Sequence, residues 1–201
     1  MFRLIAVIAG VLVVFASKPA FASACEEFTD FSTEELKELR EMLNDTDADP
    51  LDRLFALETM VCSDSPNIRH YAMKQGMEKI DEPLVRNEIM LKALLEKSRI
   101  DVEIGKAKNM SKQDKAFITE QGGVYSNQIM YRSESEGCIS LYYKDKCATE
   151  YGVYVRGDRV ELNYQYVSGV FHLSKAGELV GTLRARNNQN HAQLPAVIRL
   201  F

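Results

Sequence analysis

Apolar residues recur along the chain with two different periods. Between residues 31 and 97 they return every three or four positions, which is the period of a helix with one buried face. After residue 120 they form short runs of valine, isoleucine, leucine and tyrosine between turn residues, a pattern typical of strands. Eight of the nine tyrosines lie in this second part. The pattern predicts an α+β fold with helices first and strands afterwards.

The predicted helices begin at recognisable start signals. Ser32 and Glu35 form a capping box, in which each side chain pairs with the backbone N–H of the other. Three later starts share a proline followed after three residues by an arginine, and proline suits the first helical position because the N–H there has no helical partner. Asp49 and Ser65 precede the first two prolines, and we expect Asp81 to cap the third helix. These starts are Pro50–Arg53, Pro66–Arg69 and Pro83–Arg86.

Two of these starts resemble a known family. Ser65–Ala72 (SPNIRHYA) and Glu82–Arg86 (EPLVR) look like helix openings in HEAT-like and armadillo-like repeats, over residues 50–95. Those families stack helix pairs into curved surfaces that bind other proteins. The resemblance therefore implies a HEAT-like array, and a plain four-helix bundle with repeated proline caps is the alternative.

The second part predicts six or seven antiparallel strands, arranged as a sandwich or a small barrel. Gly157 and Gly177 lie where tight hairpin turns need a positive φ. The predicted strands are Val124–Arg132, Cys138–Tyr143, Tyr151–Arg156, Arg159–Tyr166, Val170–Leu173, Leu179–Arg186 and Ala196–Leu200.

Between the two parts, residues 98–116 read as a linker. Ile100, Val102 and Ile104 alternate with charged residues there, which predicts a short strand or an extended connector. The expected domains are therefore a helical one over residues 25–97 and an antiparallel β domain over residues 117–201.

The first 24 residues read as a secretory signal peptide. A positive start at Arg3 precedes thirteen uncharged residues, Leu4–Ala16, and small-residue tripeptides of the A-x-A type lie just before Cys25. No second apolar run of spanning length follows, so we expect a periplasmic or extracellular chain with no transmembrane span after signal removal.

The four cysteines are predicted to form two disulfides. Four cysteines allow three pairings, and we expect Cys25–Cys62 and Cys138–Cys147 because each pair then lies in one predicted domain. In the chain-entropy account these loops contribute about 4 and about 2.7 kcal/mol. The alternative is a lipid anchor on Cys25, but it leaves an odd number of cysteines.

Few residues point to chemistry. No catalytic motif is present, and the cysteines and histidines lack metal-ligand spacing, so we expect no metal and no cofactor. An exported chain with net charge −4 argues against nucleic acid as a partner. Strand alternation places Thr182 with two arginines on one face, where a cationic patch is predicted. The candidate binding residues are Arg184, Arg186, Arg199 and His191, with Arg132 as a possible neighbour.

These observations favour a non-enzymatic, disulfide-stabilised binding protein in which helices and sheet jointly present a surface to a protein partner. An inhibitor or immunity protein is a narrower form of this hypothesis. Two alternatives are a secreted or periplasmic hydrolase with a dispersed site, and a small-ligand-binding β-barrel lined by Tyr142, Tyr154 and Tyr164.

Overall fold

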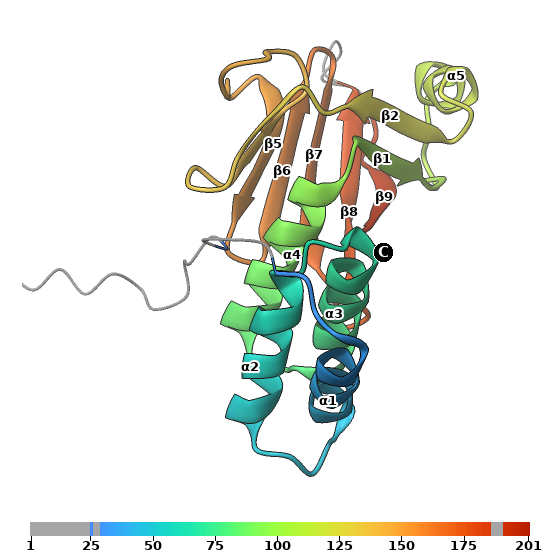
Figure 1. The fold of residues 1–201 in the computed structure, drawn as a ribbon. Coiled ribbons are helices and arrows are strands. Elements are labelled where there is room, and N and C mark those ends of the chain that lie inside the picture. Colours follow the sequence, from blue (N-terminus) through green and yellow to red (C-terminus); the bar gives the residue numbers. More distant parts are fainter. Residues whose placement is uncertain (1–24, 26–28, 186–190) are drawn as a thin grey trace, which may run out of the picture.

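The structure, a computed structural model, describes residues 25, 29–185 and 191–201. The predicted signal peptide and Arg186 lie outside the described residues. The α+β prediction is confirmed: four helices come first, and a single antiparallel sheet follows (Figure 1). The helices are α1 (Thr33–Asn44), α2 (Pro50–Val61), α3 (Pro66–Lys79), α4 (Pro83–Glu96) and α5 (Lys112–Glu120). The strands are β1 (Arg99–Ile104), β2 (Val124–Gln128), β3 (Tyr131–Ser133), β4 (Cys138–Ser140), β5 (Tyr151–Arg156), β6 (Arg159–Tyr164), β7 (Val167–Leu173), β8 (Glu178–Ala185) and β9 (Leu194–Arg199).

The helix starts follow the predicted signals, with one correction. The capping box of α1 is formed, and all three prolines occupy the start of their helices. The N-cap of α4 is Glu82 and not Asp81, and the Glu82 side chain makes no capping hydrogen bond. Because Pro83 takes the first helical position, the cap has to be the residue directly before it.

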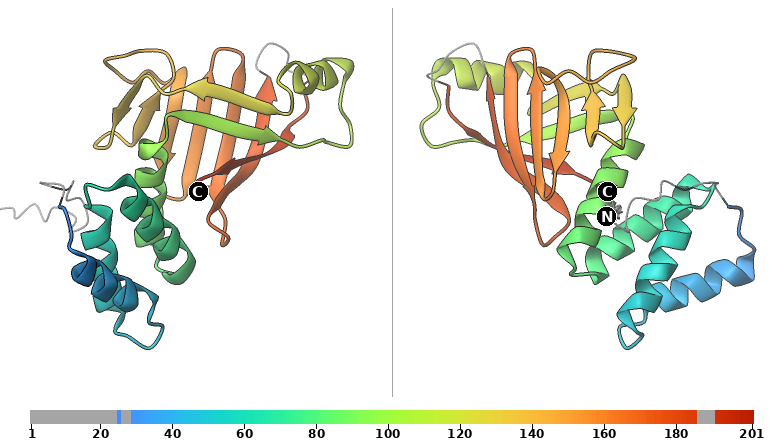
Figure 2. Two further views of the ribbon diagram at one scale, coloured as in Figure 1. Left: turned by 45° about the vertical axis from the view of Figure 1, so that its right-hand side comes forward. Right: turned by 90° about the vertical axis from the view of Figure 1, so that its left-hand side faces the viewer.

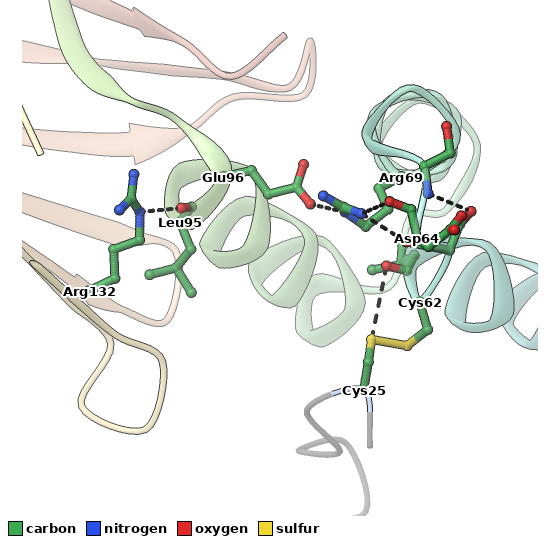
Figure 3. A network of polar contacts seen from close by, with 10 residues as sticks. Cys25, Cys62, Asp64, Arg69, Leu95, Glu96 and Arg132 are labelled. Atoms are coloured by element: carbon green, nitrogen blue, oxygen red, sulfur yellow. Dashed lines mark hydrogen bonds and ion pairs between the residues drawn. A yellow bond between two sulfur atoms is a disulfide. The ribbon is translucent and has the colours of Figure 1, made fainter. Parts of the chain in front are cut away.

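Arg69 and Arg86, each three residues after the proline that starts its helix, connect successive parts of the helical array. The Arg69 guanidinium donates to the carbonyl oxygens of Ser63, at 2.8 Å, and Asp64, at 3.0 Å, and it also pairs with Glu96 on α4 (Figure 3). Arg86 reaches the carbonyls of Met77 and Ile80 at the end of α3 in the same way. Each arginine thus satisfies carbonyls that a helix end or turn leaves without partners.

The nine strands form one sheet in the order β2-β1-β9-β8-β7-β6-β5-β4-β3. The sheet curls into a half-barrel, so that β1 and β2 run across in front of the long strands (Figure 2). Residues 129 and 130, between β2 and β3, connect the two edges of this sheet. Ile129 N–H donates to Ser98 O, just before β1, and Met130 N–H donates to Ser140 O on β4. The predicted linker, residues 98–116, holds β1 and the start of α5, and β1 lies inside the sheet between β2 and β9.

Alternation along the strands separates a core face from a solvent face. On β6 and β7, Val160, Leu162 and Phe171 are fully buried, whereas Arg159 and His172 are exposed on the opposite face. Helix α4 contributes residues such as Met90 and Leu94 to the same core cluster, so helices and sheet share one hydrophobic core.

The helical array also contacts the β7–β8 turn directly. The Arg86 guanidinium donates to Ser174 O, at 2.9 Å, and to Lys175 O, at 3.1 Å. In the same turn Gly177 has φ +77°, and a Cβ there would lie 2.6 Å from Met77 Cγ. The turn therefore needs glycine both for its backbone and for its approach to α3.

Both predicted disulfides are present. Cys25 pairs with Cys62 across a Cα distance of 5.5 Å, and Cys138 pairs with Cys147 across 6.5 Å. A sulfur that forms a disulfide is not available for a thioether-linked lipid, so the observed Cys25 pairing competes with acylation. None of the helices in the described part of the chain is both long and apolar enough to span a bilayer.

Candidate functional site

Those of the predicted cationic residues that the structure describes lie apart from one another. Arg199 lies opposite Glu178 in the register, six residues along β8 from Arg184, which corresponds to about 20 Å. Arg199 also pairs with Glu103 at 2.7 Å and Glu178 at 3.2 Å. Arg132 donates to Leu95 O, at 2.6 Å, near the end of α4 (Figure 3). Arg186 is outside the described residues.

Arg184 and His191 face different grooves. Arg184 lines a shallow polar groove of about 220 Å³ on the outer face of the sheet, together with Ser168 and Thr182. His191 lines a different groove, with Ala185, the neighbour of Arg184 that points to the opposite face. The structure therefore separates two residues that the sequence pattern had grouped.

Tyrosine rings gather at the end of the sheet remote from α1–α4. Neighbouring ring centroids in this cluster lie between 5.0 Å and 6.2 Å apart, and most of the pairs are edge-to-face. Tyr142 is 54% exposed, and the other rings are half-buried beneath it. We call this cluster the tyrosine rim; it consists of Tyr142, Tyr143, Tyr151 and Tyr164.

The loop that carries the first two rim tyrosines is braced from several sides. The Cys138–Cys147 disulfide closes it at its base. The fully buried hydroxyl of Ser140 accepts hydrogen bonds from the backbone N–H groups of Tyr142 and Tyr143, the latter at 2.9 Å. Lys146 Nζ lies 4.9 Å from the centroid of the Tyr143 ring, a cation–π contact. These contacts hold the loop and its rings in place.

The three tyrosines predicted to line a barrel interior do not share one face. Tyr164 pairs with Tyr151 and Tyr154 pairs with Glu161 across the β5–β6 ladder. Because Tyr151 and Tyr154 are three residues apart on one strand, their side chains point to opposite faces. Tyr154 therefore does not share a face with Tyr164 as predicted, whereas Tyr151 does. Counting residues outwards from the β5–β6 hairpin turn pairs Tyr151 with Tyr164, so the sequence did contain the signal that identifies Tyr151.

A second groove lies between α5 and the β6–β7 turn, at the same end of the sheet. It has a volume of about 460 Å³ and is lined by one face of α5, by Tyr125, by Gln165 and Tyr166 of the turn, and by His191. We call it the α5 groove. The rings of Phe117 and Tyr125 lie 6.1 Å apart in it.

His191 is oriented in this groove by a buried carboxylate. Its Nδ1 lies 2.6 Å from Asp114 Oδ1, with the side chains 10% and 2% exposed. Asp114 also accepts hydrogen bonds from the backbone N–H and the hydroxyl of Ser111, at 2.8 and 2.9 Å, and from the Ala192 N–H, at 3.4 Å. The same contacts with Ser111 form the capping box of α5.

The electrostatics of the α5 groove follow from these contacts. Burial by itself raises the pKa of Asp114, but the hydrogen bonds from His191, Ser111 and Ala192 outweigh it and lower the pKa to about 2. Burial raises the pKa of Tyr125 to about 12. Near neutral pH Asp114 is therefore ionised, and the Tyr125 phenol is protonated.

Among the described residues, one group has the spacing of metal ligands: Glu136, Cys138 and Cys147. Its two sulfurs are bonded to each other, and a metal requires thiolates. The short distances within this group therefore follow from the disulfide between its two cysteines.

Comparison with family models, with curated proteins and with solved structures finds no match for this chain.

Proposed function

We propose that this chain is an exported, disulfide-stabilised binding protein that contacts a protein partner through the tyrosine rim. The supporting observation is a braced cluster of four tyrosines at the free end of the sheet, in which Tyr142 is exposed and the other rings are half-buried. Tyrosine is enriched in the centres of protein interfaces because its ring buries a large area and its hydroxyl still finds a hydrogen-bond partner. A braced loop also loses little conformational entropy on binding.

Export to the periplasm or the extracellular space is part of this proposal. It is supported by the charge and apolar pattern of the first 24 residues. The two disulfides support it as well, because such bonds persist in oxidising compartments.

An inhibitor or immunity protein is the narrower form of the proposal. A stiff loop with exposed aromatic rings is a suitable shape for insertion into the cleft of an enzyme, and tight protease–inhibitor complexes are preorganised in this way. A captured partner with lytic or hydrolytic activity that the protein inhibits would support this form.

The decisive experiment is capture of a partner by immobilised mature protein from the cell-envelope and extracellular fractions. We expect Tyr142→Ala to weaken retention of the captured partner by at least tenfold, the effect of removing an interface anchor. Tyr142→Phe retains the ring and is expected to keep most of the affinity.

Phe55→Ala is the matched control, because Phe55 is 61% exposed on α2 and lies in the helical array. We expect this variant to retain the partner. Loss of the partner with Phe55→Ala and full retention with Tyr142→Ala would place the interface on the helices and overturn the proposal for the rim.

A further inference from the structure

We propose that the α5 groove is a second binding site, for a small organic cation that carries an aromatic or apolar body. This site is independent of the tyrosine rim. Its volume of about 460 Å³ falls within the range of about 300–1,000 Å³ that small-molecule sites have.

The wall of the groove supplies apolar contact for such a body. Phe117 is half-buried, and Tyr125 and Val167 are buried beneath the groove surface. Tyr166, 59% exposed in the β6–β7 turn, also lines the groove. A flat ring therefore finds several aromatic side chains in the wall, and a cation finds the negative faces of their rings.

The hydrogen bond between His191 and Asp114 favours a ligand that can donate a hydrogen bond to the other ring nitrogen of His191. The ionised Asp114 carboxylate only accepts hydrogen bonds, so Nδ1 of His191 carries a proton and donates it towards Asp114. In the neutral tautomer that this contact selects, Nε2 of the same ring is an acceptor. An ammonium or hydroxyl group in the groove can donate to it.

The charges around the groove favour a cation over an anion. Glu120, at the end of α5, is exposed at the groove and contributes a carboxylate. Asp114 adds a second negative charge behind His191. No lysine or arginine lies among the described residues that line this groove. A carboxylate or phosphate ligand would therefore meet like charge from these two carboxylates.

The test compares two ligands that differ in the sign of their charge. Tyramine and 4-hydroxyphenylacetate have the same ring and similar size, and calorimetry of the folded full-length mature protein measures the affinity of each at low ionic strength. We expect saturable binding of tyramine with one site per chain, and binding of 4-hydroxyphenylacetate at least tenfold weaker. Absence of saturable tyramine binding at millimolar concentrations, or equal binding of both ligands, overturns the proposal.

Two variants locate the site. Glu120→Gln removes a charge from an exposed side chain, so folding should be unaffected, and we expect tyramine to bind about tenfold more weakly. Glu58→Gln makes the same change on an exposed position of α2, away from the groove, and is expected to leave the affinity unchanged. Unchanged affinity in Glu120→Gln, or an equal loss in both variants, places the ligand elsewhere and overturns the proposal.

Discussion

At the scale of single residues, Asp114 joins three parts of the molecule. It completes the capping box of α5 through Ser111, it orients His191, and it receives the backbone N–H of Ala192. All of these contacts stabilise the carboxylate, since each brings a hydrogen-bond donor to a buried negative charge. The residue is therefore a structural anchor for the chain that leads into β9, as well as a support for the α5 groove.

The acid stability of the protein should depend on Asp114. Its pKa in the folded state, about 2, lies below the ordinary value of 3.8. Its contribution is therefore complete above about pH 5, where it amounts to roughly 2 kcal/mol of the free energy of unfolding, and it is lost as the pH falls through the unfolded and folded pKa values towards 2. We expect Asp114→Asn to lose this part of the pH dependence, as measured by urea unfolding between pH 7 and pH 2.

Asp145→Asn, on an exposed loop position, is the control and should leave the curve unchanged. Parallel pH curves for the wild type and Asp114→Asn would contradict the prediction.

At the scale of elements, the curl of the sheet depends on glycines at points of close backbone approach. A Cβ on Gly181 in β8 would lie 1.9 Å from Val170 O, and one on Gly152 in β5 would lie 2.6 Å from Ile139 O. Both obstacles are backbone atoms of a neighbouring strand, which cannot move without breaking the ladder. Glycine inside a strand often marks such a bend or close approach.

We expect Gly181→Ala to destabilise the fold by more than 3 kcal/mol, because the added methyl group forces neighbouring strands apart. Gly157→Ala is the comparison: φ is +62° there but the surroundings are open, so the cost should be about 1–2 kcal/mol of backbone strain. Thermal unfolding monitored by circular dichroism separates the two. Equal losses of stability in Gly181→Ala and Gly157→Ala would contradict the prediction, because the clash at residue 181 would then be relieved without cost.

At the scale of the whole molecule, Arg86 connects the helical array to the sheet. One guanidinium donates to carbonyl oxygens at the end of α3 and to two carbonyls of the β7–β8 turn. This planar group has five N–H donors and reaches both sides at once, which the ammonium group of lysine cannot do. The shared core of α4 and the strands lies beside this junction.

Arg86→Lys should therefore cost about 2–3 kcal/mol of the free energy of unfolding, since several partly buried carbonyls lose their partners together. Hydrogen exchange should rise first in the β7–β8 turn and at the end of α3. Arg156→Lys, at an exposed hairpin position, keeps the charge and should have no measurable effect. Unchanged protection at both elements in Arg86→Lys would contradict the role of this residue.

Local signals in the amino-acid sequence determined much of this protein. The helix starts at Pro50, Pro66 and Pro83, the hairpin glycines, the helix-then-strand order and both disulfide pairs follow from capping, turn and pairing rules that act over short distances or within one part of the chain. The helix starts and hairpin turns could be predicted because each depends on a few neighbouring residues, whereas the disulfide pairs were predicted from the division of the chain into a helical and a strand part.

Only the tertiary structure decided which distant residues meet. The pairing of His191 with Asp114 spans 77 positions, and the separation of Arg184 from Arg199 depends on the register of β8 and β9. The placement of β1 inside the sheet and the gathering of the tyrosine rim likewise come from the order and curl of the strands. Long-range pairing is selected by the packing of the whole core, and for that reason no local pattern reveals it.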